Sequence, residues 1–228
     1  MVKATNLTRI YKIGPRSLTA LNNVTLEIQE GEFVAITGMS GSGKSTLLHQ
    51  LGLLDHPTEG KVFIAGIEVT HLQKSERTLY RLKNLGYIFQ DYALLPTLTA
   101  SENVLLPLLM QGSGMKDAKE KAEEALSMLG LKERINNLPS QMSGGEQQRV
   151  SIARAIVNNP KILFADEPTA NLDSQTSKVV LDALQQLNNE GLTLVMVTHE
   201  PEYAKIADRN IVLADGKLVS DETRNEAK

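Results

Sequence analysis

The residues of this 228-residue chain that could do chemistry begin with a glycine-rich loop. It follows the apolar, β-rich run 33–37, and the leucines after it favour a helix. Between a strand and a helix, such glycines let backbone N–H groups converge on phosphate oxygens, and the helix start adds its positive end. The spacing predicts a phosphate-binding P-loop. Its residues are Gly38, Met39, Ser40, Gly41, Ser42, Gly43, Lys44, Ser45 and Thr46.

Three side chains of this loop have separate expected roles. Lys44 should reach the β and γ phosphates of ATP, and the Ser45 hydroxyl should ligate Mg²⁺. Thr46 is expected near the α-phosphate, as a weaker contact than Ser45. The alternative is a chance glycine-serine loop, and the strand and helix that flank it argue against that alternative.

Two adjacent carboxylates, Asp166 and Glu167, follow the buried apolar run 161–165. A pair in this position can divide its work, one carboxylate serving Mg²⁺ through water and the next polarising the attacking water. We assign Asp166 to the metal and Glu167 to the water. A solvated pair at a strand end is the alternative, and the upstream P-loop favours the catalytic interpretation.

Three further positions carry weaker signals. His199 ends the apolar run 193–198, at the edge where catalysis is expected, and there it could orient water and contact the γ-phosphate. A lone histidine is otherwise usually structural or merely exposed. Gln90 follows the run 87–89 and could bind Mg²⁺ through its amide oxygen, although a glutamine after a strand is unremarkable. Tyr11 could stack on an adenine, or simply pack.

A second glycine-rich helix start lies far downstream, where Ser143, Gly144, Gly145 and Glu146 precede a glutamine-rich stretch. One bound polyphosphate needs one phosphate-binding loop, so this second glycine-rich helix start requires another explanation. The spacing Ser-x-x-Glu is that of a capping box, in which the serine oxygen and the glutamate carboxylate satisfy each other's backbone N–H. The sequence therefore predicts that a helix begins at this point.

The composition limits the function classes. Hydrophobic residues make up 41% and charged residues 22%, which are ordinary values for a globular protein with a substantial core. The net charge of -3 argues against nucleic acid as the main ligand. The absence of cysteine excludes disulfides, thiolate catalysis and cysteine metal sites, and it suits a reducing compartment. No histidine–carboxylate spacing suggests zinc.

No segment of the sequence is predicted to enter a membrane. The first residues lack the apolar run of a signal peptide. The most lipid-like stretch, 104–110, is interrupted by Pro107, and a spanning helix needs roughly 20 apolar residues. We therefore expect a chain that is soluble by itself and reaches a membrane only through a partner.

The apolar runs also predict the fold. Runs that are continuously apolar, at 33–37, 161–165 and 193–198, indicate parallel strands covered on both faces. Between the last two, residues 174–189 have the apolar stripe of a helix that Gly191 stops. Strand, polar tip and helix in repetition predict an α/β fold, with the active site at the carboxyl ends of the strands.

Other parts of the chain depart from this pattern. Residues 1–32 and 60–70 alternate and contain turns, which predicts antiparallel strands. The segment 92–158 has helical patterns, including a helix that should start at Asp117 and stop at Gly130. We predict one domain, 1–228, with a P-loop nucleotide-binding core, an N-terminal antiparallel β subdomain and an inserted helical subdomain. The core would comprise 1–91 and 159–228, and the insert 92–158.

The order of these motifs resembles that of ATP-binding cassette (ABC) ATPases. The resemblance extends from Tyr11 to beyond His199 and includes the turn Asn171-Leu172-Asp173. It implies that two cassettes pair head to tail, with each ATP between one P-loop and the partner's signature, Ser143 to Glu146. Two residues depart from the family pattern, since Met142 replaces the commonest leucine and Glu146 the commoner glutamine.

The resemblance also implies roles for single residues. Tyr11 matches the aromatic that stacks on adenine, Gln90 the glutamine that senses magnesium, and Glu167 the catalytic base. Asp173 matches the aspartate of a turn that crosses the dimer interface, and His199 matches the switch histidine. The ligands implied are ATP and Mg²⁺.

The stretches 86–90 and 138–146 look like those of the lipoprotein-release, macrolide-efflux and cell-division branch. This likeness implies an ATPase subunit that forms an ATP-dependent homodimer, lies in the cytoplasm at the inner face of the membrane and drives a separate integral membrane permease. The apolar run 94–109 lies near the expected permease contact, although core packing explains most of its leucines better. Alternatives are a mechanotransmission ATPase without transport, or a soluble repair or translation ATPase.

Overall fold

The computed structural model describes residues 1–224, apart from the side chain of Ile13, and the chain forms two compact units. The first unit consists of residues 1–78 together with the C-terminal part from Gly191, and the second consists of residues 79–190. Helix α2 (Lys74–Asn84) contains the boundary between them. The predicted core and helical subdomain, with boundaries at 91/92 and 158/159, remain a prediction.

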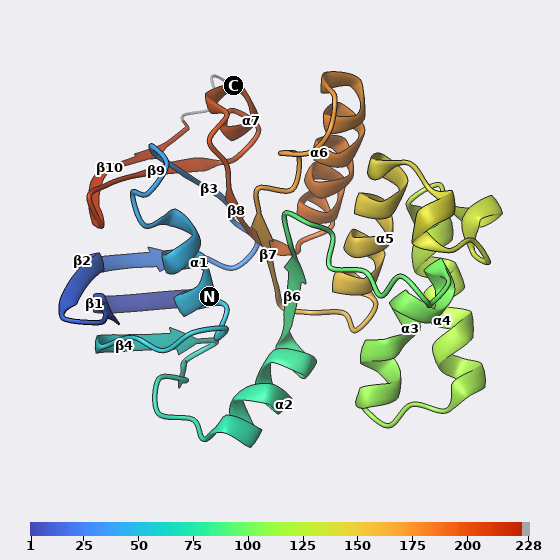
Figure 1. Ribbon diagram of the computed structural model, residues 1–228, viewed down its shortest axis with the longest axis horizontal. Helices are drawn as coiled ribbons and strands as arrows, with labels where there is room; N and C mark the ends of the chain where they lie inside the picture. The colour runs from blue at the N-terminus through green and yellow to red at the C-terminus, as the bar shows by residue number, and fades with distance from the viewer. Residues whose placement is uncertain (225–228) are drawn as a thin grey trace. The chain divides into compact units, whose positions relative to one another are not determined.

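An antiparallel sheet forms one part of the first unit (Figure 1, blue to teal). Its strand order is β2-β1-β4-β5, and every pairing is antiparallel. The strands are β1 (Val2–Ile13), β2 (Arg16–Ile28), β4 (Glu59–Ile64) and β5 (Ile67–Glu68). The antiparallel strands predicted from the alternation at 1–32 and 60–70 are therefore confirmed.

The same unit contains strands β10-β9-β3-β8, paired in that order. Strand β3 runs parallel to both β8 and β9, while β9 and β10 are antiparallel. The bounds are β3 (Phe33–Thr37), β8 (Thr193–Val197), β9 (Arg209–Ala214) and β10 (Lys217–Thr223), with helices α1 (Lys44–Leu51) and α7 (Pro201–Ala204). All residues of β8 are buried, as its continuous apolar run predicts.

The second unit combines two parallel strands with helices. Strands β6 (Leu85–Ile88) and β7 (Ile162–Asp166) pair directly, and β7 starts one residue later than the predicted run. The helices are α3 (Ala100–Met110), α4 (Met115–Met128), α5 (Gly144–Ile156) and α6 (Ser174–Asn189), with short 3-10 turns at Lys132–Arg134 and Pro139–Gln141. The helix predicted at 174–189 is confirmed without a shift.

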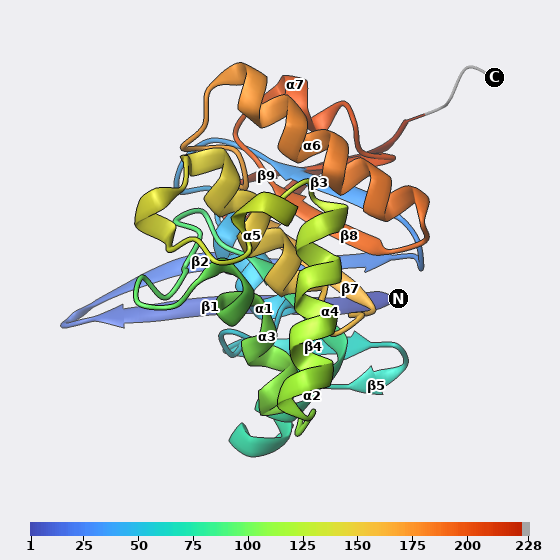
Figure 2. The ribbon, with the colours of Figure 1, turned by 90° about the vertical axis from the view of Figure 1, so that its right-hand side faces the viewer.

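Helices α3, α4 and α5 share one hydrophobic core, which Figure 2 shows as three neighbouring helices. Its members include Val104, Leu105, Leu108, Leu126 and Val150. Two leucines of the run 94–109 are thus buried as predicted for core packing, while Leu95 is 47% exposed. Among the described residues, no helix is long and apolar enough to cross a bilayer.

The predicted start of the helix at Asp117 is wrong. Helix α4 begins at Met115, and its N-cap is Gly114, without a side-chain cap. Asp117 instead lies in the first turn, where a carboxylate interacts favourably with the positive end of the helix dipole. A capping residue and a first-turn acid occur close together in sequence, so the pattern alone confuses the two.

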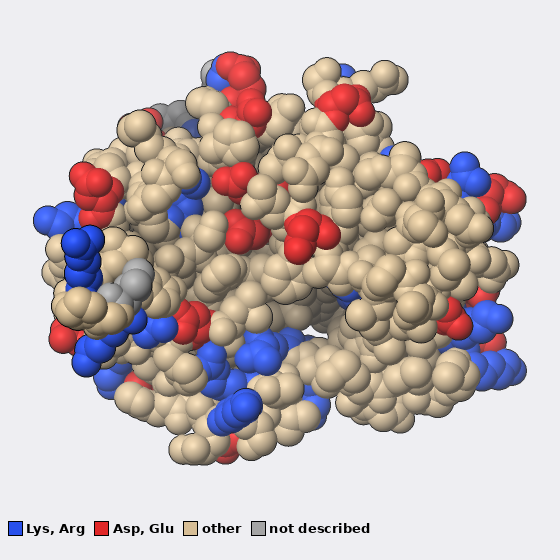
Figure 3. Space-filling view, viewed as in Figure 1, with Lys and Arg blue, Asp and Glu red and all other residues tan. Residues whose placement is uncertain are grey.

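The predicted fold class is confirmed: an α/β protein with parallel strands, an N-terminal antiparallel sheet and helices between β6 and β7. The face drawn in Figure 3 carries both acidic and basic side chains. This agrees with a sequence whose 24 Lys and Arg nearly balance its 27 Asp and Glu. The fold places the P-loop, Gln90, the pair Asp166-Glu167 and His199 at the carboxyl ends of the parallel strands β3, β6, β7 and β8.

Candidate functional site

The predicted site residues are distributed over both units. The P-loop, Tyr11 and His199 belong to the first unit, while Gln90, the signature and the acidic pair belong to the second. Within each unit the structure brings several of them together.

The P-loop connects β3 to α1, and α1 starts without a side-chain cap. Its N-cap is Gly43, with φ at 102°, and its first turn contains no acidic residue. A Cβ on Gly43 would lie 2.4 Å from the carbonyl oxygen of Ala20, so glycine is required there. The first-turn N–H groups therefore keep their partial positive charge, which suits a bound anion.

Lys44 is hydrogen-bonded to the backbone of the P-loop. The residue is 6% exposed, and Nζ donates to the carbonyl oxygens of Gly38 and Met39 at 2.9 Å each. The N–H of Ser42 also donates to the Met39 oxygen, at 3.2 Å. An ammonium group held inside the curve of the loop is well placed to meet phosphate oxygens. Ser45 and Thr46 follow in the first turn of α1.

His199 lies near the P-loop edge of its sheet. Strands β3 and β8 are parallel, with Ile36 opposite Val197, so the segments after both strands leave from the same edge. The His199 side chain is 52% exposed, and Nε2 lies 3.8 Å from a carboxylate oxygen of Glu200. This exposure leaves the imidazole accessible to a ligand at that edge.

Tyr11 lies on β1 and is partly exposed as a residue. Its hydroxyl donates to Asp55 Oδ2 at 2.8 Å, which is a packing contact. Adenine stacking by Tyr11 therefore stays a prediction.

In the second unit, Gln90 and the acidic pair share an edge. Strands β6 and β7 are parallel, with Ile88 opposite Ala165, so Gln90 and Asp166 follow the paired residues on the same side. Glu167 adopts a left-handed backbone with φ at 46°, a conformation that is strained for glutamate. The side-chain nitrogen of Asn171 donates to the Gln90 carbonyl oxygen at 3.0 Å. That bond ties Gln90 to the turn after β7.

The signature forms the predicted capping box at the start of α5. Ser143 Oγ accepts from the Glu146 N–H at 3.3 Å, and Glu146 Oε2 accepts from the Ser143 N–H at 2.8 Å. Arg134 Nε donates to the other oxygen of Glu146 at 2.8 Å. Hydrogen bonds from Arg134 and from the Ser143 N–H hold the pKa of Glu146 below its ordinary value. Glutamate therefore fits this position without loss of the cap.

A hollow of about 280 Å³ lies beside this box. It is lined by Ser143, Gly145, Glu146, Arg149, Gln175, Thr176 and Val179. A Cβ on Gly145 would come within 2.1 Å of the Thr176 methyl carbon, so the start of α5 packs tightly on the start of α6. The hollow therefore exposes the signature serine beside two helix starts.

Asp173 is the N-cap of α6. Its carboxylate accepts from the Thr176 hydroxyl at 2.6 Å and from the N–H groups of Gln175 and Thr176 at 3.0 Å. These bonds, the one from the Thr176 hydroxyl above all, lower the pKa of Asp173. The cap explains the residue type locally, and the role in a dimer interface remains a prediction.

Two polar residues of α5 were missed by the sequence reasoning. Gln148 is fully buried, and its Nε2 donates to the Pro168 oxygen at 2.7 Å, directly after Glu167. Arg154 donates to the carbonyl oxygens of Tyr92 and Ala93 at 2.8 and 2.5 Å, shortly after Gln90. A glutamine on the apolar stripe of a predicted helix was the available signal for Gln148.

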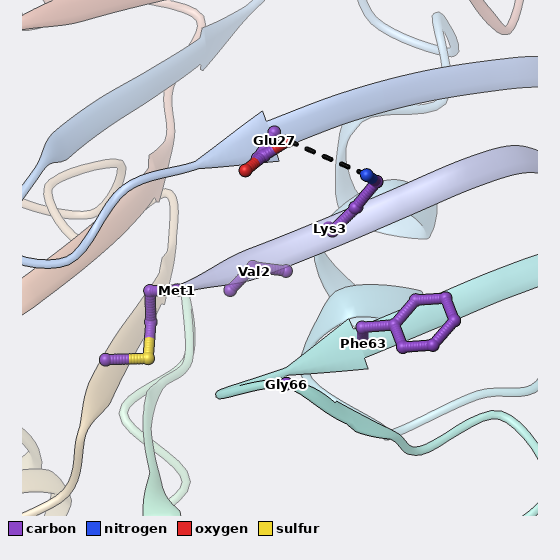
Figure 4. Close-up of a pocket in the computed structure, with 6 residues that line it drawn as sticks. All are labelled: Met1, Val2, Lys3, Glu27, Phe63 and Gly66. Carbon is purple, nitrogen blue, oxygen red and sulfur yellow. Dashed lines mark ion pairs between the residues drawn. The ribbon is translucent and has the colours of Figure 1, made fainter.

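A separate cavity of about 380 Å³ lies on the antiparallel sheet of the first unit. It is lined by Met1, Val2, Lys3, Glu27, Phe63 and Gly66, which Figure 4 shows around the Lys3–Glu27 ion pair of 3.9 Å. None of the predicted site residues lines it. The cavity therefore contributes nothing to the candidate site.

Comparisons with known proteins agree with this geometry. The sequence matches the model of the family described as "ABC transporter" over residues 21–170. It is 49% identical to the lipoprotein-releasing system ATP-binding protein LolD of Aquifex aeolicus, over 98% of both chains. It is 45% identical to the macrolide export ATP-binding/permease protein MacB of Rhodopirellula baltica, over 100% of this chain and 34% of that protein.

Solved structures are similar over nearly the whole chain. The ATP-binding cassette MJ0796 of Methanocaldococcus jannaschii, in a dimeric post-hydrolysis state bound to ADP and Pi, has 46% sequence identity and a TM-score of 0.91. The comparison covers 98% of each chain. A second dimeric structure of the same cassette has a TM-score of 0.92.

Proposed function

Because this chain belongs to the ABC transporter family and is an ATPase of that family, we propose that two copies of it pair around ATP and drive a separate membrane permease. The observation that carries the proposal is the contrast between its two glycine-rich helix starts. Helix α1 begins uncapped and suits an anion, while α5 begins with an exposed, self-capped serine. One start cradles the phosphates of its own ATP, and the other meets the ATP of the partner.

The residues of one chain divide the work on ATP. The P-loop N–H groups and Lys44 bind the β and γ phosphates. Glu167 accepts a proton from the attacking water, and His199 orients that water toward the γ-phosphate. The products are ADP and inorganic phosphate. The strained backbone of Glu167 and the anchors on its turn support its role, since such strain is concentrated at functional sites.

Magnesium is the metal that the available side chains suit. Ser45, Gln90 and Asp166 offer only oxygen ligands, and few of them, which matches an ion that keeps several waters and binds substrate phosphates. Gln90 and Asp166 lie at one edge of the second unit, as their strand register requires. When bound, Mg²⁺ would neutralise charge on the phosphates.

Among the relatives, LolD is named for lipoprotein release and MacB for macrolide export. On this basis the proposed cargo is a lipid-linked or hydrophobic molecule that the permease extrudes. The chain would then work in the cytoplasm, at the inner face of the membrane, held there by the permease.

The proposal is tested by the substitution Glu167→Gln. We expect ATP binding to persist, turnover to fall by at least about 100-fold, which corresponds to loss of general base catalysis, and a dimer to accumulate on gel filtration with ATP. The substitution Lys44→Ala should instead weaken ATP binding itself. Wild-type hydrolysis by the Glu167→Gln variant would refute the assignment, and a monomer with ATP would refute self-pairing.

A further inference from the structure

The carboxylate of Asp55, in the loop after α1, accepts five hydrogen bonds. Arg9 donates to it through Nε at 2.8 Å and through its terminal nitrogen at 2.9 Å. The Tyr11 hydroxyl donates at 2.8 Å, Gln50 Nε2 at 3.0 Å and the His56 N–H at 2.7 Å. None of these residues except Tyr11 was predicted to take part in the site.

This arrangement fixes the Tyr11 ring. The hydroxyl is held by Asp55, and the Arg9 guanidinium carbon lies 4.4 Å from the ring centroid. Arg9 is in turn bound to Asp55 by two hydrogen bonds, a geometry that is specific as well as strong. One face of the ring is thus covered by a cation, which leaves only the opposite face for a stacking partner.

The same carboxylate connects the ring to the phosphate-binding helix. Gln50 is a buried residue of α1, the helix that begins with Lys44 and Ser45 of the P-loop. Its bond to Asp55 joins the helix to the group that holds Tyr11. The base platform and the phosphate cradle are therefore linked through a single side chain.

The loop backbone is secured independently. Arg77 is buried and donates to the carbonyl oxygens of Leu53 and Asp55, at 2.7 and 3.1 Å. Burial alone would raise the pKa of Asp55, but the hydrogen bonds from His56 and Tyr11 and the charge of Arg9 outweigh it and lower the pKa. Asp55 is thus an ionised acceptor at neutral pH, on a loop whose backbone is also held by Arg77.

We propose that Asp55 is a positioning residue for the nucleotide base, holding the Tyr11 ring at a set distance from the P-loop through its bonds to Tyr11, Arg9 and Gln50. The inference rests on the proposed stacking of adenine on Tyr11. Asp55 touches no ligand itself and acts through the ring. Its loss should therefore weaken binding of nucleotides but not binding of a triphosphate that lacks a base.

The test compares two ligands by isothermal titration calorimetry on the full chain: ATP and inorganic tripolyphosphate. The substitution Tyr11→Ala should raise the Kd for ATP by roughly 5- to 150-fold, which corresponds to the about 1–3 kcal/mol that base stacking contributes. The substitution Asp55→Asn weakens the acceptor for Tyr11 and Arg9, and Tyr11→Phe removes the donor, so each should raise the Kd for ATP about 3- to 10-fold. The double variant should be little worse than Asp55→Asn, because both changes act on the same contact between Tyr11 and Asp55.

Binding of tripolyphosphate should be unchanged in all of these variants, and Glu30→Gln, at an exposed glutamate of the same unit, should change the binding of neither ligand. Equal weakening of both ligands by Asp55→Asn would mean a general structural role and overturn the inference. The inference would also be overturned if Asp55→Asn and Tyr11→Phe both bound ATP with wild-type affinity while Tyr11→Ala bound it more weakly. Wild-type affinity in Tyr11→Ala would instead remove the proposed stacking on which the inference rests.

Discussion

Helices α1 and α5 both begin at glycine-rich turns, yet the two starts are built in opposite ways. Helix α1 has a left-handed glycine at its N-cap, no side-chain cap and no acid in its first turn. Helix α5 has Ser143 at its N-cap, a complete capping box and Glu146 in its first turn. The first leaves its N–H groups and its dipole for a ligand, whereas the second satisfies part of its own start.

The difference explains why one chain contains both. A start without its own cap gains most from a bound anion, and so it suits the phosphates that the chain itself binds. A start that is already capped is stable before any partner arrives, and it presents a hydroxyl beside an open hollow. The comparison predicts that substitutions at α1 change ligand binding most, and that substitutions at α5 change stability and pairing.

The largest effect is expected for Gly43→Ala. The left-handed backbone alone costs about 1–3 kcal/mol for a non-glycine residue, and the new Cβ would meet the Ala20 oxygen. When ATP binding has to offset about 3 kcal/mol of this backbone strain, the affinity for ATP falls by roughly 100-fold. Gly41→Ala is the matched control for stability, because Gly41 is also left-handed but has open space around it. Equal melting temperatures for the two nucleotide-free variants would contradict the steric argument.

At the other start, Gly145→Ala should destabilise the chain by about 1–3 kcal/mol through overpacking, because its Cβ would meet the Thr176 methyl carbon. The second substitution Thr176→Ser removes that methyl and keeps the hydroxyl that donates to Asp173. Urea denaturation should therefore show recovery in the double variant. Additive losses would mean that the contact between α5 and α6 is not the cause.

A smaller loss is expected for Ser143→Ala. Removal of an N-cap oxygen typically costs about 1 kcal/mol of unfolding free energy, and Ser143→Thr should restore it. ATP hydrolysis should fall more than this stability change explains, since the serine is also proposed to meet the partner's ATP. If the loss of stability fully explained the loss of ATP hydrolysis, Ser143 would act only as a helix cap.

The smallest effect concerns Glu146→Gln, which keeps the capping box and loses the charge that pairs with Arg134. The folded-state pKa of Glu146 lies below its ordinary value. Its stabilisation is therefore complete above the unfolded pKa of about 4.3 and is lost as the pH falls through the lower folded value. Denaturation between about pH 5 and pH 3 should show less loss of stability in the variant than in the wild type. Parallel pH curves would refute the contribution of the pair.

Much of the fold could be predicted from local patterns. The strands around the P-loop and the helix 174–189 were predicted because continuous apolar runs and a 3.6-residue stripe are local signals. The capping box at Ser143 was equally local. The start of α4 was wrong, because glycine gives no positive capping signal and Asp117 imitates one.

The candidate site divides in the same way. Roles for Lys44, Glu167 and Ser143 could be proposed from residue type and spacing, since the motifs that contain them extend over a few positions, and these roles remain predictions. The contacts of Gln148 with Pro168 and of Arg154 with Tyr92 and Ala93 could not be predicted, because they join residues far apart in the sequence.

By itself, the sequence determined strands β3, β7 and β8, helix α6 and the glycine-rich loop that is predicted to bind phosphate, because backbone propensity, apolar period and capping act over a few residues. Only the tertiary structure decided what supports that loop. Arg9 and Asp55 are 46 positions apart, and no local pattern pairs them. The carboxylate of Asp55 is partly buried, and its hydrogen bonds come from whatever donors the fold brings to it. The fold thereby connects Tyr11 and Gln50 by hydrogen bonds to Asp55, near the C-terminal end of helix α1.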